Sequence, residues 1–379
     1  MRLTFRNGRV LSGEVLSPAT VTVADGMIEA LHAPDAQIGA DHTVDLQGGL
    51  LVPGFVDVQV NGGGGALFGE SPSVETLRTM ASAHARFGTT GFLPTIISGS
   101  LDAIAAAIAA TDAAIEAGVP GVLGIHIEGP FLNHGRKGIH DASQFRDLDA
   151  HAFKLLTSAR HGKTLVTLAP EMTNLSTIRA LAEAGVVVSA GHSDATYAET
   201  VAALESGVKG FTHLFNAMSP LTTREPGVVG AALEDRESWC SIIADGRHVA
   251  PAVMRIALRC KGPARLMLVT DAMPSVGSAE KSFLLQGQRI TVKDGVCLAA
   301  DGTLAGSDLD MAGAVRNAMT YLGLSLPAAA KLATHNPATF LGLGERIGRI
   351  APGYRADLVL ADDDLTVLRC WIAGCPMSM

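Results

Sequence analysis

Residues that can bind a metal ion or move a proton stand at the ends of several short apolar runs in the middle of the chain. One run ends in His126-Ile127-Glu128, a later run is followed by His192, and another contains His213. Asp245-Gly246-Arg247-His248 and Asp271 come further on. A carboxylate at the end of a buried run is costly unless it is paired or bound to a metal. Two histidines and one carboxylate are a sufficient ligand set for a catalytic zinc ion that keeps one position open for water. The residue types therefore predict a hydrolytic metal centre.

We assign Glu128, His192 and His213 as the metal ligands and Asp271 as the general base. Metal coordination lowers the pKa of water from ~16 to ~7, so a weakly basic carboxylate suffices to accept its proton near neutral pH. Each residue taken alone has a simpler explanation, because a histidine near a strand is often only hydrogen-bonded and Asp271 can cap a turn. Their joint occurrence favours the metal centre.

Eight apolar runs in this part of the chain read as buried parallel strands, and Ala-rich helical stretches lie between several of them. Eight such units over roughly 290 residues match the usual size of a (β/α)8 TIM-like barrel, which is an α/β fold. A doubly wound open sheet is the alternative. In a barrel, the carboxyl ends of the strands form one mouth, so the candidate ligands would converge there. The eight runs are 54–58, 91–95, 121–128, 165–169, 186–190, 210–214, 239–244 and 265–270.

The two ends of the chain have a different character, with short strand-like runs separated by turn signals. Asn7-Gly8 and Asp25-Gly26 stand between apolar runs, which is the strongest short-range signal for a β-hairpin. These patterns predict a small β-sandwich domain formed from both chain ends, residues 1–50 and 345–379. The strand candidates near the C-terminus are 357–360 and 367–372.

The remaining residues, 51–344, are assigned to the barrel. Within them, hairpin signals at Asp294-Gly295 and Asp301-Gly302 interrupt the α/β pattern. We therefore expect a β insertion near 281–305, after the eighth barrel strand.

Composition narrows the class of protein further. Of the 379 residues, 47% are apolar and 17% charged, which excludes a disordered chain. Asp and Glu outnumber Lys and Arg by 37 to 29, and no Lys/Arg cluster stands out, so nucleic acid is not an expected partner. The five cysteines are irregularly spaced, which argues against a disulfide framework. The sequence predicts neither a signal peptide nor a membrane span, so we expect a cytoplasmic protein.

Several of these motifs together carry a resemblance to the amidohydrolase superfamily. Within it, the chain resembles N-acetylglucosamine-6-phosphate deacetylases along nearly its whole length. His-x-Glu-Gly-Pro and Thr-His-Leu-Phe-Asn-Ala-Met are the motifs most specific for that deacetylase family. The matching segments are 53–57, 126–130, 191–193, 212–218, 270–272 and 348–359.

The resemblance implies removal of acetate from N-acetyl-D-glucosamine 6-phosphate, giving D-glucosamine 6-phosphate. A metal-bound water would be the nucleophile, and His140 would polarise the acetyl carbonyl. Asn216, the Ala217 backbone and Arg224 are suited to the phosphate. It also implies a homodimer, with phosphate-binding residues near the subunit interface. The residues carried over for substrate binding are Ile139, His140, Asn216, Ala217, Arg224, Asp245, Gly246, Arg247, His248, Leu304, Ala305 and Gly306.

The first predicted strand departs from the pattern of the superfamily. Many members carry a His-x-His pair there for a second metal, whereas this chain reads Asp57-Val58-Gln59-Val60-Asn61. Gln59 is a poor ligand and at most a remnant of that second site, and Lys163 lies at the wrong end of its strand to bridge two ions. We therefore expect one divalent ion per chain, with Zn²⁺ first and Fe²⁺, Mn²⁺ or Co²⁺ also compatible with the ligand set.

Two other functions remain open from the sequence. Another enzyme of the superfamily, such as an adenine deaminase or a cyclic amidase, would usually carry the His-x-His pair or the bridging lysine. A sugar-phosphate-binding barrel without catalysis would not need every catalytic residue type, and this chain has all of them.

Overall fold

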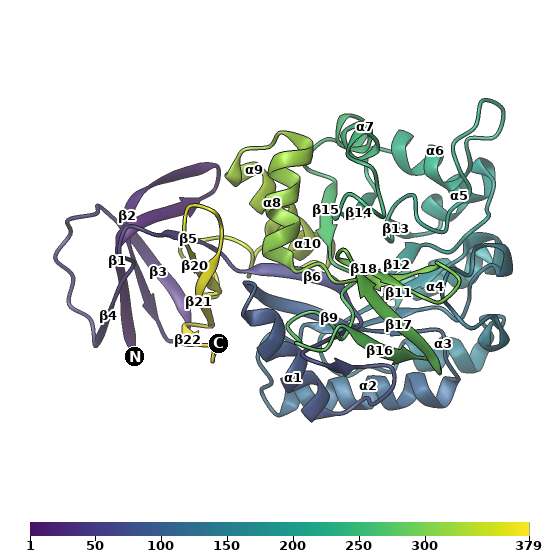
Figure 1. Cartoon of the computed structure of the whole chain (residues 1–379), viewed down its shortest axis with the longest axis horizontal. Helices are drawn as coiled ribbons and strands as arrows, with labels where there is room; N and C mark the ends of the chain where they lie inside the picture. Colours follow the sequence, from purple (N-terminus) through teal and green to yellow (C-terminus); the bar gives the residue numbers. More distant parts are fainter. Residues whose placement is uncertain (379) are drawn as a thin grey trace.

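A sheet of eight parallel strands forms the centre of the computed structural model, which describes residues 1–378. The strands neighbour one another in the order in which they occur along the chain, without the reversal of a doubly wound sheet. A parallel bridge between Val60 and Ala272 joins the first strand to the segment after the last one. The predicted (β/α)8 barrel is therefore confirmed (Figure 1). Its strands are β6 (Phe55–Val60), β9 (Thr89–Ile97), β10 (Gly124–Glu128), β11 (Lys163–Leu168), β12 (Val187–Ala190), β13 (Val208–Phe211), β14 (Trp239–Ile243) and β15 (Leu266–Val269).

Helices between and after these strands cover the outside of the barrel. In α2, Ser100 caps the first turn by accepting a hydrogen bond from Ala103 N at 3.2 Å, and the buried residues Leu101, Ile104 and Ile108 recur at helical spacing. No helix in residues 1–378 is long and apolar enough to cross a membrane. The helices are α1 (Val74–Ala85), α2 (Leu101–Glu116), α3 (Ala150–Leu156), α4 (Leu175–Glu183), α5 (Tyr197–Glu205), α6 (Gly227–Glu234), α7 (Pro251–Lys261), α8 (Met311–Leu322), α9 (Leu326–Ala333) and α10 (His335–Phe340).

Strands from both chain ends form a second sheet, at the left of Figure 1. β1 and β21 lie three places apart in this sheet, which would put them ~14 Å apart if it were flat. The rings of Phe5 on β1 and Trp371 on β21 are nevertheless only 5.0 Å apart, so the sheet curls over a core of its own as a small β-sandwich. Its strands are β1 (Arg2–Ser12), β2 (Val15–Ala24), β3 (Met27–His32), β4 (His42–Asp45), β5 (Leu50–Pro53), β20 (Leu358–Ala361), β21 (Val367–Ile372) and β22 (Cys375–Pro376).

One of the two hairpin predictions at the N-terminus is wrong. Asp25-Gly26 does form the turn between β2 and β3. Asn7-Gly8, however, lies inside the continuous strand β1, where the register with β2 shifts. There β1 changes its parallel partner from β4 to β5, and Asn7 takes a φ of 61°. Gly8 is needed here for close packing and not for a turn, because a Cβ at this position would lie 2.6 Å from Leu46 Cβ. The Asn-Gly dipeptide alone therefore does not distinguish a bulge from a hairpin turn.

An antiparallel sheet follows the eighth barrel strand, where the sequence indicated an insertion. Asp294-Gly295 turns the chain between two of its strands, with φ values of 51° and 76°. Its buried side chains, including Leu285 and Ile290, pack with Ile97 at the end of β9 and with Ile139 from a barrel loop. The insertion therefore forms part of the wall around the barrel mouth. The strands are β16 (Ser282–Leu285), β17 (Gln288–Lys293), β18 (Val296–Leu298) and β19 (Leu304–Ser307).

Candidate active site

The backbone turns sharply at the ends of three barrel strands that carry candidate site residues. His192, His213 and Asp271 each lie two residues beyond the last residue of a strand, with φ values of 49°, 36° and 53°. Residues other than glycine rarely adopt this left-handed region, and such conformations cluster at functional sites. Glu128 is the last residue of β10. The barrel mouth thus collects four side chains from β10, β12, β13 and β15.

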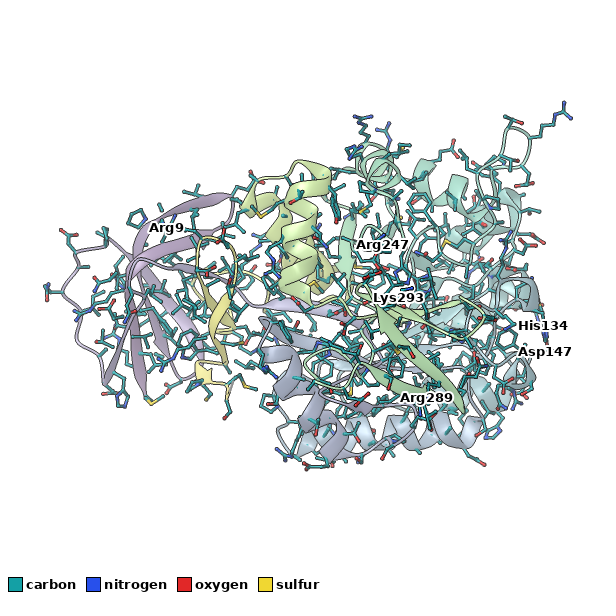
Figure 2. The ribbon with its side chains drawn as sticks, viewed as in Figure 1. Arg9, His134, Asp147, Arg247, Arg289 and Lys293 are labelled. Atoms are coloured by element: carbon teal, nitrogen blue, oxygen red, sulfur yellow. The ribbon has the colours of Figure 1, made fainter. Side chains whose placement is uncertain are left out.

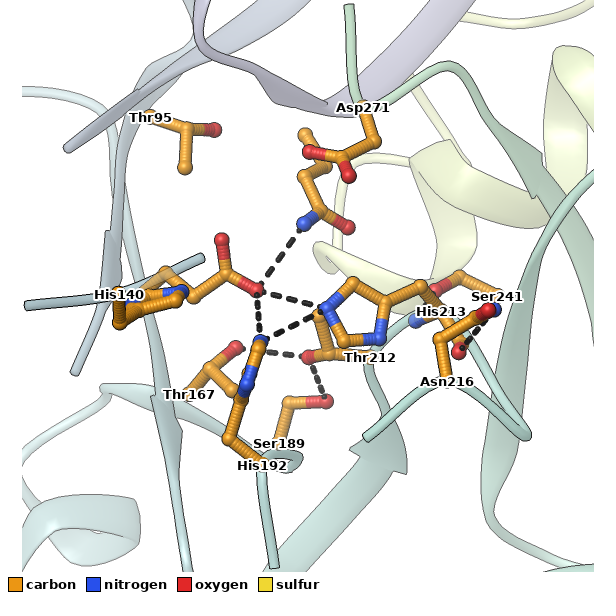
Figure 3. Close-up of polar contacts among 12 residues, drawn as sticks. Thr95, His140, Thr167, Ser189, His192, Thr212, His213, Asn216, Ser241 and Asp271 are labelled. Atoms are coloured by element: carbon orange, nitrogen blue, oxygen red, sulfur yellow. Dashed lines mark hydrogen bonds and ion pairs between the residues drawn. The ribbon is translucent and has the colours of Figure 1, made fainter. Parts of the chain in front are cut away.

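Glu128, His192 and His213 meet at one point. Glu128 Oε1 lies 2.9 Å from His213 Nε2 and 3.3 Å from His192 Nε2, and the two Nε2 atoms are 3.1 Å apart (Figure 3). Tetrahedral zinc with bonds of ~2.0–2.1 Å holds its ligand atoms roughly 3.3 Å from one another. The three atoms therefore have the spacing of a metal-binding triad.

Hydrogen bonds determine which ring nitrogen of His192 is free. Its Nδ1 lies 2.9 Å from the carbonyl oxygen of Arg136, which can only accept, so Nδ1 carries the hydrogen and the Nε2 lone pair points to the triad. Burial alone would raise the pKa of Glu128, but the contacts with His192 and His213 hold that pKa well below its usual range. Both features suit residues that bind a cation.

His140 lies beside this triad and offers a hydrogen-bond donor. Its Nδ1 accepts from the backbone N–H of Ser98 at 3.3 Å and lies 2.8 Å from Ser98 Oγ, so the ring hydrogen is on Nε2. Glu128, His140 and His192 also have possible ligand atoms within 4.8 Å of one another. We favour His213 over His140 as the third ligand because a protonated Nε2 has no free lone pair. Burial lowers the pKa of His140 well below its ordinary value, which keeps the ring neutral.

Asp271 is a half-buried carboxylate with one side-chain partner among residues 1–378. Asn61 Nδ2 donates to its Oδ1 at 2.7 Å. Burial, together with the negative charge of Glu128, raises the pKa of Asp271 to about 6. A carboxyl with this pKa can accept a proton and return it near neutral pH.

These side chains open into a cavity of about 220 Å³. Thr303, Leu304 and Gly306 of the insertion close one side of it. Gly306 has a φ of 65°, and a Cβ there would lie 2.8 Å from the carbonyl oxygen of Asp271, so glycine is needed at this position. The predicted residues that line the cavity are Glu128, Ile139, His140, His192, His213, Asn216, Ala217, His248, Asp271, Leu304 and Gly306.

The other predicted residues lie outside that lining, for different reasons. Asp245 contacts His248, whose Nδ1 lies 2.6 Å from the Asp245 carboxylate. Gln59 lies behind the triad and donates to Glu128 Oε1 at 3.1 Å. Arg224 is exposed in the loop between β13 and α6. Gly246, Ala305 and the exposed Arg247, which Figure 2 labels on the barrel, also do not line the cavity.

Sequence reasoning missed two residues that hold the site together. Asn61 was read only as part of a departure from the superfamily pattern, although its place two residues after Gln59 puts both side chains on the same side of the first strand. Ser98, which contacts His140, follows an apolar run, and no motif in the sequence marks it as a site residue. Hydrogen bonds near the triad also link Thr167, Thr212 and Ser189, which went unassigned (Figure 3). Two further buried residues, Thr95 and His126, extend this chain to Thr167.

Comparison with known families agrees with this barrel and its His/Glu cluster. The sequence model of the amidohydrolase family matches residues 50–375. The chain therefore belongs to the amidohydrolase family.

Individual relatives are similar over nearly the whole chain. The N-acetylgalactosamine-6-phosphate deacetylase of Shewanella sp. (strain ANA-3) is 44% identical, covering 96% of this chain and 92% of its own length. The N-acetylglucosamine-6-phosphate deacetylase of Haemophilus influenzae is 34% identical, covering 95% of each. The crystal structure of N-acetylglucosamine-6-phosphate deacetylase from Pasteurella multocida has a TM-score of 0.96 at 32% identity, covering 100% of both chains.

Proposed function

We propose that this protein deacetylates N-acetyl-D-glucosamine 6-phosphate, giving D-glucosamine 6-phosphate and acetate. The observation that carries the proposal is the convergence of Glu128, His192, His213, His140 and Asp271 on one cavity. Relatives named as deacetylases of amino-sugar 6-phosphates, 34% to 44% identical over nearly the whole chain, support the substrate class. A catalytically inactive binding barrel would not require this set of groups.

In this proposal Glu128, His192 and His213 hold one divalent metal ion, with zinc expected first. When bound, the ion lowers the pKa of a coordinated water and polarises a carbonyl oxygen. The spacing of the three ligand atoms and the free lone pair of His192 support this assignment. Gln59 turns its NH₂ group toward Glu128, so it presents a donor rather than a ligand. This supports one ion per chain.

Asp271 and His140 then carry the proton and charge changes of the reaction. Asp271 accepts the proton of the attacking water and gives it to the leaving amine, which its pKa of about 6 permits. His140 donates its Nε2–H to the acetyl oxygen, which gains negative charge as the carbonyl carbon becomes tetrahedral. Its Nδ1 contacts with Ser98 hold the ring in the required tautomer.

The phosphate would lie at the other end of the cavity. Asn216, the Ala217 backbone and His248 line that cavity, and Asp245 holds the His248 ring. Arg224 is outside its own chain's cavity, which supports a homodimer in which the arginine reaches the partner's site. A homodimer in the cytoplasm, with a small domain of residues 1–50 and 345–379 beside a barrel of residues 51–344, completes the proposal.

The C4 epimer is a second candidate substrate. Two relatives, 44% and 36% identical to this chain, are named N-acetylgalactosamine-6-phosphate deacetylases. The two sugars share the acetamide and the phosphate and differ only in the direction of one hydroxyl group. The same catalytic residues therefore serve both.

Acetate release tests the function directly. The purified protein, supplied with Zn²⁺, should release acetate from N-acetylglucosamine 6-phosphate, and comparison of kcat/KM for the two epimers ranks them. Unphosphorylated N-acetylglucosamine is the control and should react far more slowly. No acetate from either sugar phosphate with Zn²⁺, Fe²⁺, Mn²⁺ or Co²⁺ would refute the proposal.

Replacing His192 or His213 by Asn should remove both the metal and the activity. Each imidazole supplies one of three protein ligands, and the remaining two hold the ion weakly. Metal analysis of the purified wild type should give about one equivalent per chain. Two firmly held equivalents in fully active protein, or retained metal in both variants, would contradict the assignment.

Asp271→Asn should lower kcat by ~10²–10⁴-fold while metal content survives, because proton transfer by a placed carboxylate contributes about that factor. In the wild type, activity requires the ionised base and should fall as pH drops through its pKa of about 6. A bound cation lowers this pKa further, so the acid limb of kcat/KM should lie at about pH 6 or below. An acid limb clearly on the alkaline side of neutrality would assign the base to another group.

Arg224→Ala should raise KM for the sugar phosphate by about 10- to 150-fold, the value of one charge-assisted hydrogen bond. Hydrolysis of unphosphorylated N-acetylglucosamine should barely change. Arg78→Ala, which removes another exposed arginine from the outer face of α1, is the matched control and should leave both substrates unaffected. Equal losses on both sugars in Arg224→Ala would indicate a structural role instead.

A further inference from the structure

Two amides at the end of the first barrel strand, Gln59 in β6 and Asn61 directly after it, each contact a carboxylate of the candidate site. Gln59 Nε2 donates to Glu128 Oε1 at 3.1 Å, and Asn61 Nδ2 donates to Asp271 Oδ1 at 2.7 Å. These contacts place both amides on the interior side of the barrel. Both are buried, with exposed fractions of 1% and 2%.

We propose that each of these amides positions one of the two carboxylates. Gln59 orients Glu128 for the metal ion, and Asn61 orients Asp271 for proton transfer. Each amide directs its NH₂ group toward a carboxylate and would act through that carboxylate, so both are positioning residues. The inference rests on the proposed function, which makes Glu128 a ligand and Asp271 the base.

The chemistry of the partners determines how each amide is turned. An ionised carboxylate only accepts hydrogen bonds, so Gln59 and Asn61 must direct their NH₂ groups toward it. Their oxygens, Gln59 Oε1 and Asn61 Oδ1, are then buried without a hydrogen-bond partner in residues 1–378. Leaving a buried acceptor unpaired is unfavourable. An apolar residue of similar size would avoid that cost, so the donated hydrogen bond is what the amide contributes here.

The backbone around Asn61 holds its side chain at a fixed distance from Asp271. Asn61 N and Gly62 N both donate to the carbonyl oxygen of Ala272, at 2.9 and 3.0 Å, and Asp271 N donates to Gln59 O at 3.0 Å. The buried His84 Nε2 donates to Gly62 O at 2.8 Å and fixes the next residue of the loop. With both backbones held, the side-chain hydrogen bond selects the rotamer of Asp271. It engages Oδ1 and leaves Oδ2 for the proton.

Removing each of the two amides should therefore have a different effect. Without Asn61, Asp271 keeps its place but loses its orientation, so turnover falls while the metal and the substrate still bind. Without Gln59, Glu128 loses a hydrogen bond that aligns it as a ligand, and such partners typically change metal affinity by about 10- to 100-fold. A purely structural role would instead lower stability and all activities together.

The experiment compares Asn61→Ala, Gln59→Ala and the control Asn336→Ala in the full-length protein loaded with Zn²⁺. Asn336 is also an asparagine that is 2% exposed, and its amide donates to two backbone oxygens at 2.7 Å, one of them Leu266 O at the start of β15. Three properties are measured for each protein. They are Tm, the zinc that remains bound as the chelator concentration is raised, and kcat and KM for the 6-phosphate substrates.

Asn61→Ala should lower kcat by about 10- to 100-fold, with KM within about 3-fold of wild type and full zinc retention. Gln59→Ala should lose zinc at about 10- to 100-fold lower chelator concentration and recover most of its kcat when zinc is in excess. Asn336→Ala should lower Tm and leave zinc retention and kcat unchanged. If Asn61→Ala does not fold, Asn61→Leu keeps the volume without the donor and should show the same loss of kcat.

Unchanged kcat in the folded Asn61 variants, or zinc loss equal in the Asn61 and Gln59 variants, would overturn the inference. A wild type that binds zinc but releases no acetate would overturn the proposed function and the role of Asn61 with it. The zinc measurements would still decide the role of Gln59 in that case.

Discussion

The geometry of the site depends on the burial of one carboxylate. Glu128 is 2% exposed, and removing a carboxylate from water costs several kcal/mol unless hydrogen bonds or a cation compensate. Its Oε1 lies within 3.3 Å of nitrogens of Gln59, His192 and His213. These nitrogens come from the ends of β6, β12 and β13, while Glu128 ends β10. The cost of burying Glu128 is therefore fully compensated only when these strands are assembled in the barrel. The geometry of the site thus depends on the fold.

The same coupling extends to the seam where the barrel closes. Asp57 of β6 accepts hydrogen bonds from the backbone and hydroxyl of Thr270, directly after β15, and from Gln59 N. Burial raises the pKa of Asp57 to about 7. The hydrogen bonds from Thr270 and Gln59 act in the opposite direction, because they favour the ionised carboxylate. The candidate base Asp271 is the next residue after Thr270. The hydrogen bonds that close the sheet thus also place the base.

The two ends of the cavity differ in how far hydrogen bonds within this chain already hold the side chains in place. At the reaction end, Ser98 and Asn61 already hold His140 and Asp271 by hydrogen bonds. At the end proposed for the phosphate, the Asn216 amide donates to the backbone oxygen of His213, and Arg224 lies outside the cavity. The chain carries a formal charge of −8 and repels a dianion at long range. Affinity for the proposed sugar phosphate would therefore have to come from local contacts, including those proposed from a second copy.

The sequence by itself determined the barrel, its mouth and the candidate ligands, because buried parallel strands read as apolar runs and a polar residue at the end of such a run stands out. It could not distinguish the bulge at Asn7-Gly8 from a hairpin, since Gly8 is needed for close packing against Leu46, a contact between segments distant in the chain. It also did not identify Ser98 or Asn61 as partners of His140 and Asp271. Those pairs lie 42 and 210 residues apart along the chain. Only the tertiary structure decides them, because a hydrogen bond depends on the distance and direction between two atoms, and barrel closure sets both.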